Sequence, residues 1–219
     1  MMKLVLFDLD GTLIDSALDL GWALNTLLMQ ANKPPIAIEK IRPWVSGGAG
    51  MLIRGGFGID AQHPKYEPLK RQLVGLYAEN PLKHTVLFDG IEEVLFSLEK
   101  QGLLWGIVTN KMGWLTDPIV RTLGWETRSV CTISGDTLPQ QKPDPAQLLH
   151  ACTLAHIAPV DSLYVGDAVT DIQAGQRAGM QTLVATYGYL SATDRPEQWG
   201  ATGLLSKPTD LLDWLENRA

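Results

Sequence analysis

The sequence has few cysteines and no long apolar run. Only Cys131 and Cys152 are present among 219 residues, and two cysteines so far apart predict neither a disulfide framework nor a zinc site. The apolar stretches fall well short of the roughly 18 residues that a membrane-spanning helix needs. The N-terminus shows no signal-peptide pattern. These absences predict a cytoplasmic protein with reduced thiols and no membrane partner.

Positive charge is also scarce. The chain has 18 Lys and Arg against 24 Asp and Glu, for a net charge of −6, and the basic residues are scattered. From this composition we expect no nucleic-acid-binding surface. The four histidines show no metal-ligand spacing. Hydrophobic residues, at 45%, are sufficient for one core with a sizeable insertion. Both a monomer and a homodimer remain open.

The chain changes character along its length. Residues 3–7 read as a buried strand, and the stretch from 15 to 85 contains no strand of comparable quality. Within that stretch the pattern predicts helices at 15–31, 36–45 and 65–79, with the glycine-rich segments 46–50 and 55–58 between them.

From residue 90 onward, helices alternate with short apolar strands, which is typical of βαβ units and a parallel sheet. We therefore predict an α/β core formed by residues 1–14 and 86–219, interrupted after its first strand by a small all-helical domain at 15–85. The predicted strands lie at 103–108, 129–133, 162–165 and 181–184, and the predicted helices at 90–100, 113–123, 144–155, 169–178 and 209–217.

Polar residues follow several of these strands. Asp8 and Asp10 come directly after strand 3–7, and adjacent carboxylates raise each other's pKa unless a cation or hydrogen-bond donors compensate. Because ligands bind beyond the carboxyl ends of parallel strands, we expect the polar segments to share one site. The other segments are Thr109-Asn110-Lys111, Lys142-Pro143-Asp144-Pro145 and Gly166-Asp167-Ala168-Val169-Thr170-Asp171.

This set of groups suits phosphoryl transfer. One carboxylate can attack phosphorus to form an aspartyl-phosphate, and a second can protonate the leaving oxygen and later activate water. Asp8 and Asp167 supply the hard oxygen ligands that Mg²⁺ prefers. Thr109 and Lys142 are suited to holding the negative phosphoryl group. Taken singly, an aspartate at a strand end is commonly a turn former and a lysine commonly lies on the surface, so the prediction depends on their joint placement.

These segments resemble, in the right order, the four motifs of the haloacid dehalogenase (HAD) superfamily. The motifs are Asp8-Leu9-Asp10-Gly11-Thr12, Thr109-Asn110, Lys142-Pro143-Asp144-Pro145 and Gly166-Asp167-x-x-x-Asp171. The resemblance covers essentially the whole chain and implies a Rossmann-like core with a helical cap inserted after the first motif.

The resemblance also implies roles for the site residues. Asp8 would be the nucleophile and Asp10 the general acid/base, with Thr109 and Lys142 holding the phosphoryl group. Magnesium would be bound by Asp8, the backbone carbonyl of Asp10 and Asp167. Asp171 would be either a ligand or a neighbour of the ligands. Members that dehalogenate carbon lack an acid at the second position, so Asp10 favours phosphate chemistry.

More local stretches resemble the phosphoglycolate phosphatase branch, among them Trp105–Lys111 and Tyr187-Gly188-Tyr189. The segment Pro196-x-x-Trp199-Gly200-Ala201 resembles relatives that act on N-acetylmuramic acid 6-phosphate in cell-wall recycling. The expected activity is therefore hydrolysis of a small phosphorylated metabolite, most simply phosphoglycolate, with N-acetylmuramic acid 6-phosphate as the alternative. A sugar phosphomutase and a non-catalytic phosphoacceptor module are the alternatives.

Substrate selection is expected to depend on two regions. Asn110 and Lys111 adjoin Thr109 and are candidates for contact with the substrate. In the predicted cap, the backbone N–H groups of Gly47 and Gly48 could approach an anion. A helix–helix turn is an equally simple interpretation of the glycines. Arg54 could pair with a substrate carboxylate, although a surface position is the simpler interpretation of a single arginine in a helical insertion.

Overall fold

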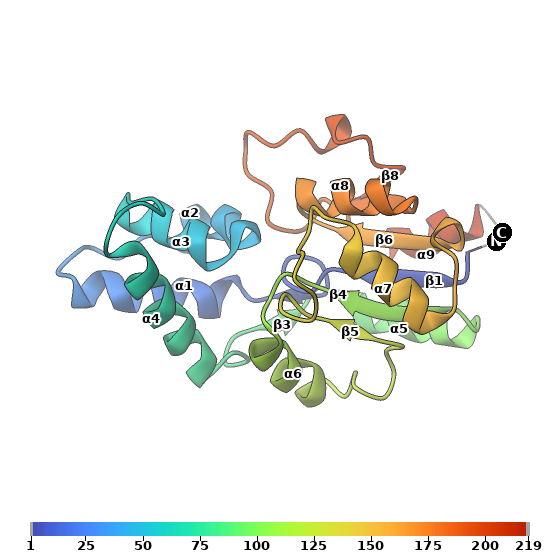
Figure 1. Ribbon diagram of the computed structural model, residues 1–219, viewed down its shortest axis with the longest axis horizontal. Coiled ribbons are helices and arrows are strands. Elements are labelled where there is room, and N and C mark those ends of the chain that lie inside the picture. Colours follow the sequence, from blue (N-terminus) through green and yellow to red (C-terminus); the bar gives the residue numbers. More distant parts are fainter. Residues whose placement is uncertain (1, 218–219) are drawn as a thin grey trace. The chain divides into compact units, whose positions relative to one another are not determined.

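The apolar run Leu4–Phe7 forms β1, an inner strand of a six-stranded sheet whose paired strands all run parallel. All four residues of β1 are buried, as expected for a strand covered on both faces. Figure 1 shows the computed structural model, which describes residues 2–217. The sheet order is β5 (Thr132–Ile133), β4 (Leu104–Val108), β1, β6 (Ser162–Gly166), β7 (Gln181–Ala185) and β8 (Gly203–Leu205).

Helices cover both faces of this sheet. α7 (Ala146–Ala155) packs against β1, β4 and β5, and α8 (Val169–Ala178) packs beside it against β6 and β7. α5 (Ile91–Lys100) packs on β4 and contacts α9 (Asp210–Glu216) (Figure 1). The parallel α/β fold predicted from the alternating pattern is confirmed. The remaining helices of this part are α6 (Gly113–Thr122) and the short η2 (Pro159–Asp161) and η3 (Pro196–Gln198).

The chain divides into two compact units. One contains the segments up to Ile14 and from Leu87 onward, and the other is Asp15–Val86. The chain passes between them twice, and the two crossing segments, β2 (Ile14–Asp15) and β3 (Val86–Leu87), pair as a two-stranded sheet. Within the second unit, the Asp19 carboxylate accepts hydrogen bonds from the backbone N–H groups of His84 and Thr85, at 2.9–3.1 Å. These bonds tie the start of the helical unit to its end.

The helical unit contains a helix that the sequence did not predict. Glycines were expected to separate helices, yet Gly48–Phe57 forms α3. Packing explains the difference, since a Cβ at Gly55 would lie 2.6 Å from the Trp44 ring and one at Gly56 would lie 2.7 Å from Leu24. Close approach to these side chains offsets the low helix propensity of glycine. The other helices are α1 (Ala17–Gln30), α2 (Ile38–Ile41), η1 (Arg42–Gly47) and α4 (Tyr66–Glu79).

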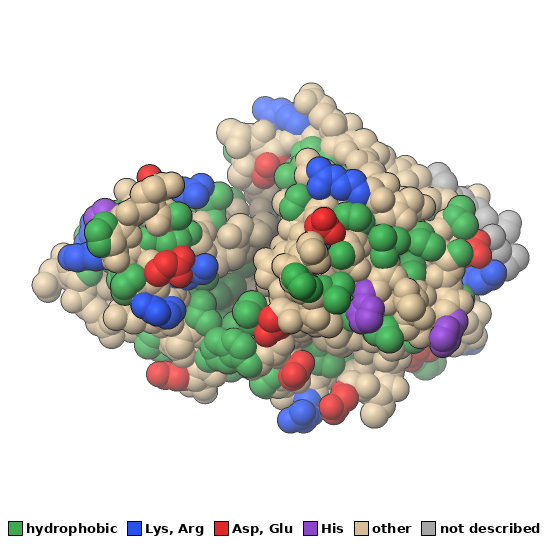
Figure 2. Space-filling model, viewed as in Figure 1, with side chains coloured by type: hydrophobic (Ala, Val, Ile, Leu, Met, Phe, Trp, Pro, Cys, Tyr) green, Lys and Arg blue, Asp and Glu red, His purple; other side chains and the backbone are tan. Residues whose placement is uncertain are grey.

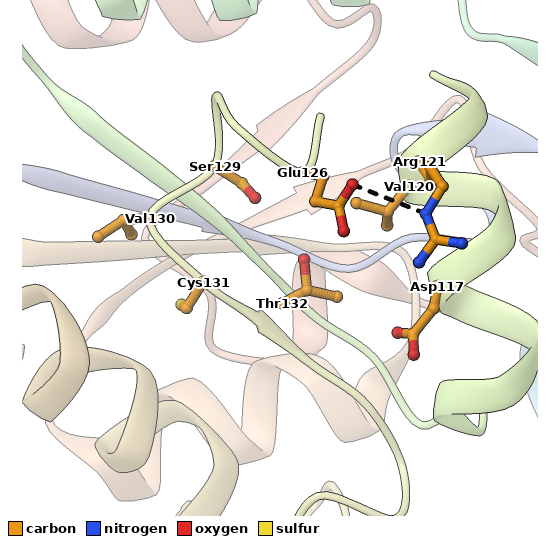
Figure 3. A pocket seen from close by; sticks show the side chains of 8 residues that line it. All are labelled: Asp117, Val120, Arg121, Glu126, Ser129, Val130, Cys131 and Thr132. Carbon is orange, nitrogen blue, oxygen red and sulfur yellow. Dashed lines mark ion pairs between the residues drawn. The ribbon is translucent and has the colours of Figure 1, made fainter. Parts of the chain in front are cut away.

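The sheet differs from the sequence-based expectation in two places. The strand expected at 129–133 is reduced to the two residues of β5, and β8 was not predicted. Beside β5 lies a surface pocket of about 330 Å³, lined in part by α6 and by an ion pair between Arg121 and Glu126 at 3.7 Å (Figure 3). None of the predicted site residues lines it.

Two further observations concern the surface and the helices. On the face shown in Figure 2, Lys and Arg side chains are separated by acidic, apolar and uncharged groups. Among residues 2–217, no helix combines the length and the apolar character needed to cross a membrane.

Candidate active site

Three neighbouring strands deliver polar residues to one edge of the sheet. Asp8 follows β1, Thr109 follows β4 and Asp167 follows β6. Ladder hydrogen bonds continue to these residues, since the Asp8 N–H donates to the Val165 carbonyl and the Thr109 N–H to the Ile133 carbonyl, each at 2.9 Å. The backbone of the sheet therefore fixes the positions of these side chains.

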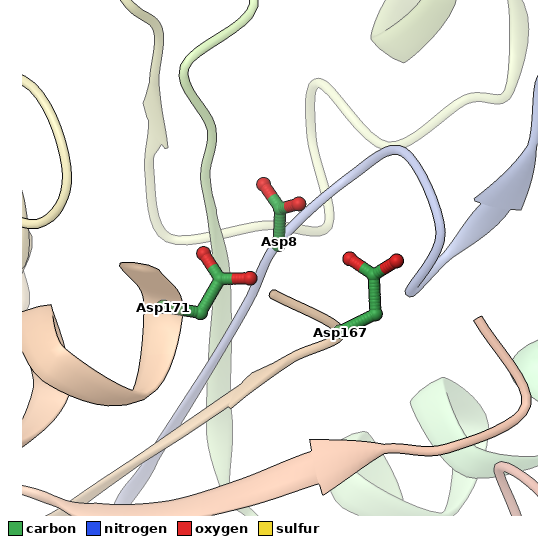
Figure 4. A group of neighbouring side chains, drawn as sticks. All are labelled: Asp8, Asp167 and Asp171. Carbon is green, nitrogen blue, oxygen red and sulfur yellow. The ribbon is translucent and has the colours of Figure 1, made fainter. Parts of the chain in front are cut away.

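Asp8, Asp167 and Asp171 bring their carboxylates together. One oxygen from each lies within 4.8 Å of the others. Asp171 stands in the first turn of α8, which is separated from β6 only by Asp167 and Ala168. The three side chains project to the same side (Figure 4). Asp167 and Asp171 are each 1% exposed. Such close, buried like charges need compensation from a cation.

Lys142 supplies part of that compensation. Its Nζ lies 2.8 Å from Asp8 Oδ1 and 2.7 Å from Asp171 Oδ1, and the side chain is 3% exposed. It also lies 2.7 Å from the Tyr164 hydroxyl. The Asn110 side-chain amide exchanges two hydrogen bonds, each 3.1 Å, with the backbone N–H and carbonyl of Lys142. The ammonium is thus held between two carboxylates.

Burial and charge set the protonation of this pair. Burial raises the pKa of Asp8, the Lys142 charge lowers it, and the Asp171 charge raises it again, leaving a pKa of about 6. Burial alone would lower the pKa of Lys142, but Asp171 and Asp8 outweigh it and hold that pKa above the ordinary value. Lys142 therefore stays charged throughout the pH range in which Asp8 titrates.

Asp10 pairs with a different cation. Lys111 Nζ lies 2.9 Å from both Asp10 Oδ1 and Oδ2. The side chains are 7% and 17% exposed, respectively. The Lys111 backbone N–H donates to Thr109 Oγ1 at 3.1 Å, so this ion pair adjoins the buried Thr109. The structure therefore brings eight predicted residues together at the sheet edge or beside it: Asp8, Asp10, Thr109, Asn110, Lys111, Lys142, Asp167 and Asp171.

Sequence reasoning missed two tyrosines around the site. Tyr164 is wholly buried in β6, and its hydroxyl donates to the Val108 carbonyl at 2.8 Å while accepting from Lys142. In the sequence it is one apolar-looking position of a core strand. The Tyr189 N–H donates to Asp167 Oδ2 at 2.8 Å. A Cβ at Gly188 would lie 2.5 Å from the Asp167 Cβ, so this approach requires glycine. In the sequence, the Tyr187-Gly188-Tyr189 stretch resembled the phosphoglycolate phosphatase branch, but the resemblance did not indicate what these residues do.

The predicted residues of the helical unit lie on its surface. Gly47 ends η1, and Gly48 begins α3 with a φ of +64°, and both are exposed. Arg54 is exposed on α3. Their predicted part in substrate binding stays a prediction.

The charges at the sheet edge fit a divalent cation. The carboxylates of Asp8, Asp10, Asp167 and Asp171 outnumber the ammonium groups of Lys111 and Lys142, which leaves a formal charge of −2. The clustered donors are all carboxylate oxygens, the ligand type that Mg²⁺ prefers. Soft or nitrogen ligands are not part of this cluster, so its chemistry matches magnesium better than zinc or copper.

Comparison with known proteins agrees with this arrangement. The sequence profile of haloacid dehalogenase-like hydrolases matches residues 5–185. An N-acetylmuramic acid 6-phosphate phosphatase from Pseudomonas aeruginosa is 38% identical over 215 residues, which cover 98% of this chain and 95% of that protein. A phosphoglycolate phosphatase from Xylella fastidiosa is 40% identical over 212 residues, covering 94% of this chain and 90% of that protein.

The fold comparison agrees with these relatives. A solved structure described as a predicted phosphoglycolate phosphatase from Haemophilus somnus matches with a TM-score of 0.86 at 29% identity, and the match covers 98% of each chain. The profile and the relatives extend over both the sheet and the polar segments at its edge. The chain therefore belongs to the haloacid dehalogenase-like hydrolase family.

Proposed function

We propose that this protein is a magnesium-dependent phosphomonoester hydrolase that forms an aspartyl-phosphate on Asp8. The observation that carries the proposal is the pairing of Asp8, at the end of β1, with the buried Lys142 ammonium at 2.8 Å. A carboxylate held there by a fixed cation suits in-line attack on phosphorus, since the cation also neutralises an incoming phosphoryl group. The relatives at 38% and 40% identity carry phosphatase names.

The reaction divides between the two aspartates of the first motif. An Asp8 oxygen forms a bond to phosphorus as the bond from phosphorus to the ester oxygen breaks. Asp10, which must first take up a proton from solvent, gives that proton to the departing oxygen. Asp10 then takes a proton from water as that water attacks the phosphorus, which releases inorganic phosphate and restores Asp8. Thr109 and Lys142 would hold the phosphoryl oxygens throughout.

Asp8, Asp167 and the backbone carbonyl of Asp10 are the proposed magnesium ligands. When bound, the ion neutralises phosphoryl charge and helps to orient the group. Both oxygens of Asp171 already have partners, Lys142 Nζ at 2.7 Å and the Ala168 N–H at 2.9 Å. We therefore assign Asp171 mainly to positioning Lys142. Asn110, which binds the backbone of Lys142, has the same positioning role in addition to its predicted substrate contact.

The helical unit is the proposed cap, at residues 15–85. A cap over a phosphoryl-transfer site excludes water and supplies contacts to the leaving group. Gly47, Gly48 and Arg54 are its proposed substrate contacts. We propose a cytoplasmic location separately, on the scarcity of cysteine.

We expect removal of magnesium to abolish turnover and to lower stability in a pH-dependent way. The pKa of Asp8 is raised from 3.8 to about 6, so between these values the metal-free folded state binds more protons than the unfolded state. Its stability therefore falls as pH rises through that window. Mg²⁺ competes with those protons, so its stabilisation should be larger at pH 8 than at pH 5.

Thermal unfolding with EDTA or MgCl₂ at the two pH values measures this effect. Mass action gives about 1.4 kcal/mol of stabilisation when free Mg²⁺ is about ten times its Kd. Asp167→Asn is the matched variant, because it should weaken the response to Mg²⁺. An unfolding temperature that is the same with EDTA and with MgCl₂ at both pH values would contradict the proposed site.

A substrate panel tests the function itself. It should contain 2-phosphoglycolate, N-acetylmuramic acid 6-phosphate and hexose phosphates, and kcat/KM is compared across it. Phosphoglycolate is our preferred substrate type, and the second candidate is supported by the Pseudomonas aeruginosa relative. Release of inorganic phosphate without isomer formation excludes a phosphomutase. Repeated turnover excludes a phosphoacceptor module.

A further inference from the structure

The ion pair between Lys111 and Asp10 is the least expected feature of the site. The ammonium lies 2.9 Å from each oxygen of the Asp10 carboxylate, and both side chains are largely shielded from solvent. The other lysine of the site, Lys142, instead contacts Asp8 and Asp171. Each site cation thus has its own carboxylate partners.

This contact conflicts with the proposed work of Asp10. A general acid/base must come within hydrogen-bond reach of the ester oxygen of the substrate. Here one cation is shared by both oxygens of the carboxylate that would make that approach. Lys111 therefore competes with the ester oxygen for this carboxylate, and a buried ammonium that leaves a carboxylate needs another anion.

We propose that Lys111 is a specificity-determining residue that exchanges Asp10 for an acidic group on the leaving-group side of the substrate. The inference rests on the proposed phosphatase function and adds to it a reason for substrate choice. A substrate with such a group gains a charge-assisted hydrogen bond and frees Asp10 in the same event. A substrate without it leaves Lys111 on Asp10.

Geometry limits where the acidic group can stand. The ester oxygen must lie one hydrogen bond from Asp10, and Lys111 Nζ lies 2.9 Å from the same carboxylate oxygens. The acidic group must therefore be attached close to the ester oxygen. Phosphate monoesters of 2-hydroxy acids meet this condition, since their carboxylate is borne on the carbon that carries the ester oxygen.

Two substrates of matched size test the proposal. 2-Phosphoglycolate and ethyl phosphate both have a two-carbon leaving group, and only the first carries a carboxylate. We expect Lys111→Gln to lower the ratio of their kcat/KM values by about 10- to 100-fold, which corresponds to one hydrogen bond to a charged group. Lys111→Arg, which keeps the charge, should restore most of the ratio. Lys100→Gln, at an exposed position of α5, is the matched control and should leave it unchanged.

A binding measurement separates recognition from chemistry. In an Asp8→Asn background, calorimetry should show that 2-phosphoglycolate loses affinity on Lys111→Gln by a larger factor than ethyl phosphate does. The proposal is overturned if the ratio of kcat/KM for 2-phosphoglycolate to kcat/KM for ethyl phosphate is the same in wild type and in Lys111→Gln. A variant that loses activity equally on both substrates leaves this ratio unchanged and therefore also overturns it. If Lys111→Gln does not fold, the wild type is compared on 2-phosphoglycolate and 3-phosphopropionate, and equal kcat/KM values overturn it. Failure of the phosphatase proposal is distinct, because wild-type protein would then hydrolyse none of these esters.

Discussion

Asp8→Asn is expected to abolish turnover of every phosphomonoester that the wild-type protein hydrolyses. The amide oxygen is a far weaker nucleophile than a carboxylate, so no aspartyl-phosphate forms. Loss of a nucleophile in a covalent mechanism reduces kcat by roughly 10⁴-fold or more. Steady-state phosphate release gives the loss in kcat, and rapid quench followed by intact-protein mass spectrometry shows whether phosphorylated protein accumulates.

The control for Asp8→Asn makes the same chemical change elsewhere. Asp213 is exposed on α9, and Asp213→Asn should retain full turnover. Thermal unfolding of both variants checks that the fold is intact. Substantial phosphate release by folded Asp8→Asn protein would rule out the aspartyl-phosphate mechanism. The same result would leave the family and the fold untouched.

Lys142→Met is expected to cause the largest loss of stability of any single change at the site. Its ammonium is 3% exposed and balances both Asp8 and Asp171. Removing one partner from a buried ionic cluster leaves uncompensated charge and costs about 3–5 kcal/mol of the free energy of unfolding. Turnover should be lost as well, since the phosphoryl group loses a neutralising cation. Chemical denaturation of metal-free protein measures the first effect.

The loss in the free energy of unfolding caused by Lys142→Met should become larger as pH rises. The pKa of Asp8 already lies at about 6 with Lys142 present, against 3.8 for an unperturbed carboxyl, and losing the cation raises it further. The folded variant then binds more protons than the unfolded chain above about pH 4, so its stability falls as pH rises. We expect a larger deficit at pH 8 than at pH 5.

A surface lysine provides the comparison for Lys142. Lys3 pairs with Asp161 at 3.0 Å, and its side chain is 56% exposed. Lys3→Met should cost less than about 1 kcal/mol, as is usual for exposed ion pairs. If Lys142→Met and Lys3→Met lower the free energy of unfolding equally, the buried charges around Lys142 do not contribute to stability as expected.

Much of the fold follows from local sequence. Leu4–Phe7 is apolar at every position, and helices and strands then alternate from residue 90, so a parallel sheet with covered faces is the simplest solution. The same reasoning failed where packing overrides propensity. α3 contains Gly55 and Gly56 because Trp44 and Leu24 lie where their side chains would be. Local patterns carry no information about such neighbours.

The candidate site divides in the same way. The order of Asp8, Thr109 and Asp167 after three strands predicts that they meet, because parallel strands end at one edge of a sheet. The sequence therefore determined which residue types gather there, and with them the reaction class.

Only the tertiary structure decided which charges pair. Lys142 comes from the loop before α7 and reaches Asp8 and Asp171, whereas Lys111 reaches Asp10 instead. Tyr164 and Tyr189 hold Lys142 and Asp167 through a buried hydroxyl and a backbone N–H. Partner choice depends on side-chain reach across segments far apart in the chain, a property that no local pattern records.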